Sequence, residues 1–83
     1  MKVLKFSAEW CGPCKMLSAT IEKYYKGDIV IEEVDIDQKR ELANQYGIRG
    51  VPTLVLLDDN DVEIRRKSGM MMINEFEEFI KGE

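Results

Sequence analysis

Two short apolar runs, at residues 2–7 and 29–36, lie on either side of a segment with helical spacing. Apolar side chains recur at helical intervals through residues 16–25, and Pro13 stands where the first turn of a helix tolerates proline. Each apolar run has the length and composition of a β-strand. Because a helix joins them, the two strands are expected to be parallel, which makes residues 2–36 a βαβ unit.

The rest of the chain predicts a second helix, a hairpin and a third helix. We expect a short helix at 38–46, capped by Asp37 and ended by Gly47. Two strands, 53–57 and 62–67, are joined by residues with turn chemistry and form an antiparallel hairpin. Residues 73–81 have an amphipathic helical pattern. The order is βαβαββα, an α/β domain over residues 1–83 with a four-stranded mixed sheet flanked by three helices.

Size, composition and charge exclude several classes of protein. The chain has 83 residues, 45% hydrophobic and 34% charged, which fits one globular domain. Its formal net charge is −4 and its lysines and arginines are scattered, so no nucleic-acid partner is expected. Residues 1–10 resemble neither a signal peptide nor a membrane span, so we expect a cytoplasmic protein without a membrane partner.

The two cysteines, Cys11 and Cys14, form a Cys-x-x-Cys motif between the first strand and the first helix. This position is typical of a redox motif, because backbone N–H groups and the dipole at a helix N-terminus favour a thiolate. Cys11 is the expected nucleophile. Cys14, one turn into the helix, is the expected resolving thiol, which attacks a mixed disulfide on Cys11.

Other uses of the cysteine pair fit less well. A structural zinc site needs about four Cys or His ligands, whereas this chain has two cysteines and no histidine, so no metal is expected. The lack of histidine also argues against a Cys-His hydrolase. A structural disulfide across two residues closes too small a loop to stabilise much, and two inert buried cysteines remain the simplest alternative. The cysteines themselves carry two electrons, so no organic cofactor is expected.

Three segments together resemble the thioredoxin family. They are WCGPC with the preceding SAE and the following Lys15, YGIRGVPTL at 46–54, and KSG at 67–69. Their order and spacing match the family over nearly the whole chain from Val3 onward. The chain lacks the additional N-terminal strand and helix of full-length thioredoxins, so the resemblance implies a minimal thioredoxin fold of glutaredoxin size.

The resemblance also implies roles for residues around the cysteines. Trp10 would flank the nucleophile, although it could instead pack in the core. Gly12 and Pro13 would set the redox turn. A groove for a substrate polypeptide would be lined by Val51, Pro52, Gly69 and Met70. The family has a cis bond before this proline, whereas the residues alone favour trans. Met70 to Met72 could equally fill the core.

The chain departs from the family beneath the cysteines. Thioredoxins commonly have a buried Asp in the strand before the motif and a Lys beside it, whereas this chain has Lys5 and Glu33 at those positions. We hypothesise a Lys5–Glu33 ion pair in which Glu33, or water held by the pair, accepts the proton of Cys14 and Lys5 favours thiolates. The alternative is two exposed charges at an edge. Ser7 replaces an aromatic residue that is frequent in the family.

These observations predict a monomeric dithiol-disulfide oxidoreductase that reduces protein disulfides. Its partners would be disulfide-containing protein substrates and a thioredoxin reductase as electron donor. One alternative is a glutaredoxin-like enzyme that uses glutathione. A second is a thioredoxin-fold protein-binding module in which the dithiol is incidental. A role as an oxidase or isomerase fits less well, because no secretion signal is recognised.

Overall fold

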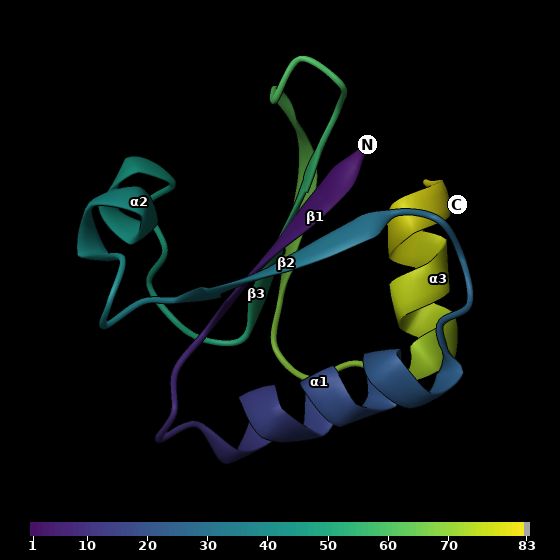
Figure 1. Cartoon of the computed structure of the whole chain (residues 1–83), viewed down its shortest axis with the longest axis horizontal. Coiled ribbons are helices and arrows are strands. Elements are labelled where there is room, and N and C mark those ends of the chain that lie inside the picture. Colours follow the sequence, from purple (N-terminus) through teal and green to yellow (C-terminus); the bar gives the residue numbers. More distant parts are fainter. Residues whose placement is uncertain (83) are drawn as a thin grey trace.

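The computed structural model describes residues 1–82, and the last residue of the predicted domain, Glu83, lies outside them. A single four-stranded sheet has the order β2-β1-β3-β4 (Figure 1). The strands are β1 (Lys2–Ser7), β2 (Val30–Asp35), β3 (Thr53–Leu57) and β4 (Glu63–Ser68). β1 is parallel to β2 and antiparallel to β3, and β3 is antiparallel to β4, so the predicted βαβ unit, hairpin and mixed sheet are confirmed.

The helices cover both faces of the sheet. They are α1 (Gly12–Tyr24), α2 (Arg40–Gln45) and α3 (Ile73–Lys81). α1 and α3 pack together on one face, where Leu17 and Phe76 join Val3 of β1 in one core cluster. α2 lies on the opposite face, where Ala43 packs with Phe6 in a second cluster. Figure 1 shows this separation, with α2 apart from the other two helices.

The central strand β1 is covered from both sides. Val3 faces the cluster under α1 and α3, and Leu4 and Phe6 face the cluster under α2. Because side chains alternate along a strand, Lys5 points to the same face as Val3, toward α1. A buried position on that face puts the lysine among apolar side chains, which makes its partner important for the site.

The first helix begins ahead of its apolar residues, at the cysteine motif, as the positions of Pro13 and Cys14 predicted. α1 starts at Gly12 because Cys11 acts as its N-cap, with Sγ accepting a hydrogen bond from the Cys14 N–H at 3.2 Å. Pro13 lies in the first turn, as predicted. A cysteine sulfur is not among the usual N-cap groups, so the capping role of Cys11 was not predicted.

The prediction that Asp37 caps the second helix is wrong. α2 begins only at Arg40, and Lys39 occupies the N-cap without a capping side-chain hydrogen bond. The preceding turn is closed by Asp35, whose Oδ1 accepts from the Asp37 N–H at 2.8 Å. The Asp37 carboxylate instead accepts a hydrogen bond from Trp10. Asp37 therefore holds Trp10, the residue next to Cys11, and does not cap α2.

The hairpin turn between β3 and β4 is organised by Asp58. Its Oδ1 accepts hydrogen bonds from the backbone N–H groups of Asn60 and Val62 at 2.8 and 3.0 Å. The turn therefore has the chemistry that the sequence predicted. Within residues 1–82, the helices are all too short or too polar to cross a bilayer.

Candidate redox site

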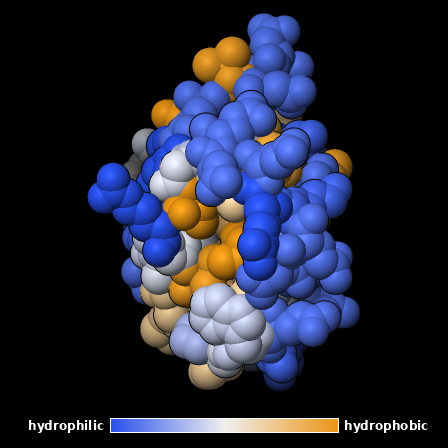
Figure 2. Space-filling model, turned by 90° about the vertical axis from the view of Figure 1, so that its left-hand side faces the viewer, coloured by the Kyte–Doolittle hydropathy of each residue, from blue (hydrophilic) through white to orange (hydrophobic). Residues whose placement is uncertain are grey.

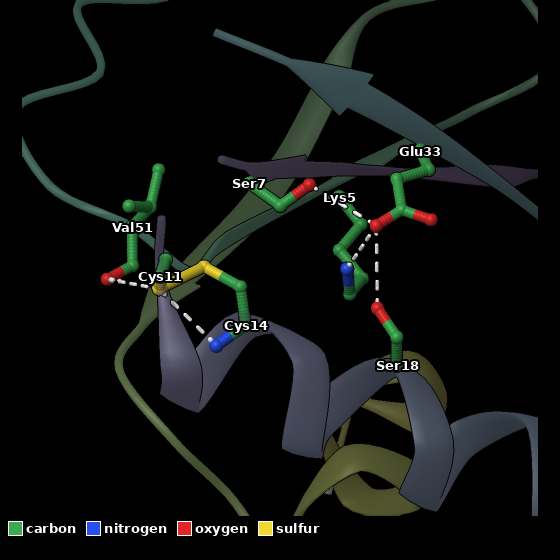
Figure 3. Close-up of polar contacts among 7 residues, drawn as sticks. All are labelled: Lys5, Ser7, Cys11, Cys14, Ser18, Glu33 and Val51. Carbon is green, nitrogen blue, oxygen red and sulfur yellow. Dashed lines mark hydrogen bonds and ion pairs between the residues drawn. A yellow bond between two sulfur atoms is a disulfide. The ribbon is translucent and has the colours of Figure 1, made fainter. Parts of the chain in front are cut away.

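The two cysteines lie at the N-terminus of α1 and are joined by a disulfide (Figure 3). Their Cα atoms are 5.3 Å apart. Both side chains are covered in this state, with Cys11 5% and Cys14 2% exposed. Cys11 precedes the helix, whereas Cys14 lies within its first turn, so the strand-turn-helix context predicted for the motif is confirmed.

The environment of Cys11 favours a negative charge on its sulfur after reduction. Cys11 Sγ already accepts the N–H of Cys14, one of the backbone donors that a helix N-terminus leaves without an intrahelical partner. The aligned peptide dipoles of α1 add partial positive charge at this end. These two features are the physical conditions that lower the pKa of a cysteine thiol at such a position.

The loop before β3 forms the opposite wall of the site. The Val51–Pro52 peptide bond is cis, as the family resemblance implied and contrary to the preference of the residues alone. Cys11 Sγ lies 3.8 Å from the Val51 carbonyl oxygen, and Val51 packs against both cysteines and Ala8. The Gly69 N–H donates to the Pro52 carbonyl at 2.8 Å, and its φ of 93° is a conformation that favours glycine.

Trp10 extends into solvent beside the cysteines. Its side chain is 70% exposed, so the alternative that it packs in the core is wrong. Its Nε1–H donates to Asp37 Oδ2 at 2.9 Å, which ties the indole to the turn after β2. A large, exposed aromatic group held by a hydrogen bond is well suited to contact a partner surface.

The methionine run is divided between core and surface. Met71 is 1% exposed and belongs to the core cluster under α1 and α3. Met70 and Met72 are 44% and 68% exposed. Figure 2 shows one face of the molecule, with apolar atoms exposed among hydrophilic side chains in its lower half. Met71 therefore fills the core, whereas Met70 and Met72 do not, and a role of Met70 in substrate binding stays a prediction.

Lys5 and Glu33 form an ion pair, but with unequal burial. Lys5 Nζ lies 2.9 Å from Glu33 Oε1, and the two residues are register partners of β1 and β2. The Lys5 side chain is 2% exposed and the Glu33 side chain 61% exposed. The predicted pair is confirmed, and the alternative of two exposed charges is wrong for Lys5. The hydrogen bond from Lys5 lowers the pKa of the Glu33 carboxyl from its usual value.

Two serines complete this network. The hydroxyl groups of Ser7 and Ser18 donate to Glu33 Oε1 at 3.1 and 3.3 Å (Figure 3). An open cavity of about 530 Å³ is lined by both serines, Glu33 and Cys14. Sequence analysis did not identify Ser18, although its position four residues after Cys14 places both side chains on one face of α1. It also missed the role of Asp37 beside Trp10.

Fold and site together define a class of small α/β proteins with a cysteine pair at the N-terminus of the first helix and a cis proline opposite. A family model described as Thioredoxin matches residues 1–82. The thioredoxin of Mycoplasmoides gallisepticum is 37% identical over 81 residues, which cover 95% of this chain and 80% of that protein. The chain belongs to the thioredoxin family.

Two further comparisons agree. The thioredoxin of Pseudomonas aeruginosa is 38% identical over 64 residues, 74% of this chain, and the match spans 59% of that relative's length. A single-residue mutant of a thioredoxin from Halobacterium salinarum has a solved structure with a TM-score of 0.87 and 34% identity, covering 96% of this chain and 71% of that one. The likeness confirms the predicted minimal thioredoxin fold.

Proposed function

We propose that this protein is a dithiol-disulfide oxidoreductase that reduces disulfides of protein substrates. The observation that carries the proposal is the Cys11–Cys14 disulfide at the N-cap of α1, where Cys11 Sγ accepts a backbone N–H. This geometry stabilises a thiolate on Cys11 when the disulfide is opened. The family match favours this function over a glutathione-coupled enzyme or a binding module.

The reaction proceeds in two exchange steps. In the reduced protein the Cys11 thiolate attacks one sulfur of a substrate disulfide, the substrate S–S bond breaks, and the other substrate sulfur leaves and takes a proton. Cys14, as thiolate, then attacks Cys11 Sγ. The mixed disulfide breaks, the second substrate thiol is released, and the Cys11–Cys14 disulfide forms. Two electrons pass to the substrate, and a thioredoxin reductase is the proposed donor that restores the dithiol.

The exposed rim supports the binding of an extended polypeptide. Trp10 and Met70 offer exposed apolar surface, and Gly12 and Pro13, between the two cysteines in the sequence, are exposed as well. The Val51 carbonyl oxygen lies 3.8 Å from Cys11 Sγ, and the hydrogen bond from the Gly69 N–H to the Pro52 carbonyl holds the adjoining backbone in place. These residues are therefore the proposed substrate-binding set. The cytoplasmic location stays a prediction.

Reduction of insulin disulfides tests the proposal. The protein is supplied with electrons by NADPH and a thioredoxin reductase, or by glutathione with its reductase, in parallel. We expect turnover with the thioredoxin reductase, loss of turnover in C11S, and accumulation of a mixed disulfide with substrate in C14S. Turnover with glutathione alone would instead support the glutaredoxin-like alternative, and full biological activity of C11S would support the binding module.

A further inference from the structure

The central strand β1 carries a lysine that is almost completely buried, on the Cys14 side of the cysteine pair (Figure 3). Lys5 is 2% exposed, and its ammonium group pairs with Glu33 Oε1 at 2.9 Å. A buried charge is costly unless it is paired and hydrogen-bonded. A methionine of similar length would fill the same apolar space without this cost. We therefore expect the buried charge of Lys5 to have a function other than stabilising the fold.

Glu33 holds that charge in place from the solvent side. Its Oε1 atom accepts from Lys5 and Ser7 of β1 and from Ser18 of α1, so one oxygen joins three elements of the fold. The hydrogen bond from Lys5 lowers the pKa of this carboxyl, and Ser7 and Ser18 act in the same direction. A carboxylate with a lowered pKa is a weak proton acceptor, which argues against the hypothesis that Glu33 takes the proton of Cys14.

The network adjoins the resolving cysteine and not the substrate rim. Cys14, Ser7, Ser18 and Glu33 line one open cavity, and Lys5 lines the adjacent one together with Ser18 and Glu33. In Figure 3, Cys14 lies between Cys11 and this network, and Val51 lies on the other side of Cys11. The open cavity therefore borders Cys14, which is itself 2% exposed, on the side where Glu33 and Asp35 of β2 lie.

We propose that Lys5 acts through Cys14, as a buried positive charge that favours the thiolate form of the resolving sulfur, while Glu33, Ser7 and Ser18 position the ammonium group. The thiol proton of Cys14 leaves to water in the open cavity that Cys14 lines, because Glu33 Oε1 already accepts hydrogen bonds from Lys5, Ser7 and Ser18. This inference rests on the proposed function, since it assigns a role in the second exchange step. It reverses the sign of the buried charge that the family resemblance implied.

Other charged groups face the same cavity but are more strongly screened. They are Glu9, Lys15, Glu22, Asp35 and Lys39. Four of these are exposed and Asp35 is half-buried. Exposed charges interact through water and counterions, whereas a buried charge acts through the protein interior, where the effective dielectric constant is lower. Glu33 opposes the charge of Lys5 but is 61% exposed and therefore more strongly screened, so we expect a net positive field from the pair at Cys14.

The test is a pH titration of the Cys14 thiol in C11S, where it is the single thiol. The ultraviolet absorbance of the thiolate reports the fraction that is deprotonated. K5M is expected to raise the midpoint of the Cys14 titration by about one pH unit. Below the midpoint, the fraction of Cys14 present as thiolate then falls about tenfold. K5Q, which keeps a donor for Glu33 without the charge, serves as the second variant and is expected to do the same. Far-UV circular dichroism checks that each variant is folded.

The control is K2M, which removes a lysine of the same strand that pairs with Glu32 at 3.6 Å and is 35% exposed. It is expected to leave the midpoint in place. E33Q keeps an oxygen for the three donors but removes the negative charge, so its midpoint is expected not to rise. An unchanged midpoint in folded K5M and K5Q, an equal rise in K2M, or a rise in E33Q would overturn the inference. The titration uses neither substrate nor reductase, so its result is independent of the insulin assay.

Discussion

Glu33 makes the stability of the protein depend on pH in a defined direction. Its folded-state pKa lies below the ordinary value of 4.5 because of the hydrogen bond from Lys5. The pair therefore contributes its full stability above that value, and the contribution is lost as the pH falls through the lower folded pKa. We expect the free energy of unfolding of the wild type to fall more steeply below about pH 4.5 than that of E33Q.

Urea denaturation at a series of pH values measures this difference. The comparison is made between wild type and E33Q, because the amide retains an oxygen that accepts from Lys5, Ser7 and Ser18. The Glu33 side chain is 61% exposed, so solvent screening keeps the expected difference small. Parallel curves for the two proteins across the acid range would contradict the prediction.

Asp37 determines how Trp10 is presented. Its carboxylate accepts the indole N–H at 2.9 Å, and the ring is otherwise largely in solvent. In D37A the indole loses this anchor, and we expect the reduction of insulin to slow by about two- to tenfold, the range that corresponds to one hydrogen bond. Reduction of a small aromatic disulfide, which needs little of the rim, is expected to change less.

The matched control for D37A is E41A, which removes an exposed carboxylate from the nearby helix α2. It is expected to leave both rates unchanged. Equal losses with insulin and with the small disulfide in D37A would show that Asp37 affects the exchange chemistry and not the presentation of Trp10.

At the scale of elements, the local sequence pattern was sufficient to predict a helix or strand where one face of it is apolar and ordinary turn residues stand at its ends. The bounds predicted for β1, β3 and α3 agree with the structure. Sequence patterns were less informative where a side chain binds another residue of the site instead of making the backbone contact that is usual for its type. Asp37 binds Trp10 instead of capping α2, and the cap of α1 by the Cys11 sulfur, at the helix N-terminus where Cys11 was predicted, was not foreseen.

Part of the redox site was also predicted from the sequence. The cysteine pair and the partnership of Lys5 with Glu33 follow from the motif and from adjacent parallel strands. The burial of Lys5 against the exposure of Glu33 could not be predicted, because it depends on how α1 covers β1 and leaves the edge strand β2 open. The part played by Ser18 depends on the same packing of α1 against the sheet.

Helix α3 stabilises the fold through Phe76. This side chain is completely buried in the cluster under α1 and α3, and its ring meets Tyr25 edge to face with centroids 5.3 Å apart. F76A is expected to lower the free energy of unfolding by about 3–5 kcal/mol through lost burial and a residual cavity. Denaturant unfolding measures the loss.

F76L is the control for this prediction, because it removes less volume and keeps an apolar side chain. It is expected to be less destabilising than F76A. A loss below about 1 kcal/mol in F76A would mean that the space is refilled by neighbouring side chains, contrary to the tight packing described.

At the scale of the whole molecule, both edges of the sheet carry charges. β2 has Glu32, Glu33 and Asp35, and β4 has Arg65, Arg66 and Lys67. Charged edge strands resist pairing with a second copy of the same edge, because like charges would face each other. This argues against dimers in which one edge pairs with its own copy. We predict a monomer, and sedimentation velocity over a wide range of protein concentrations checks it and also detects pairing of the acidic β2 edge with the basic β4 edge of a second copy. A dimer stable on dilution would contradict the prediction.

The central position of β1 has a consequence during synthesis. β1 leaves the ribosome before the other strands of this sheet, yet its register partners in β3 lie about 50 residues later, for example Leu57 opposite Lys2. At about 5–20 residues per second the strand waits roughly 3–10 seconds for that partner, with its apolar side chains uncovered. Lys5 interrupts this apolar run, and a charge within such a segment acts as a gatekeeper against aggregation of nascent chains. The same lysine that ends beneath the cysteines therefore protects the strand before the sheet exists.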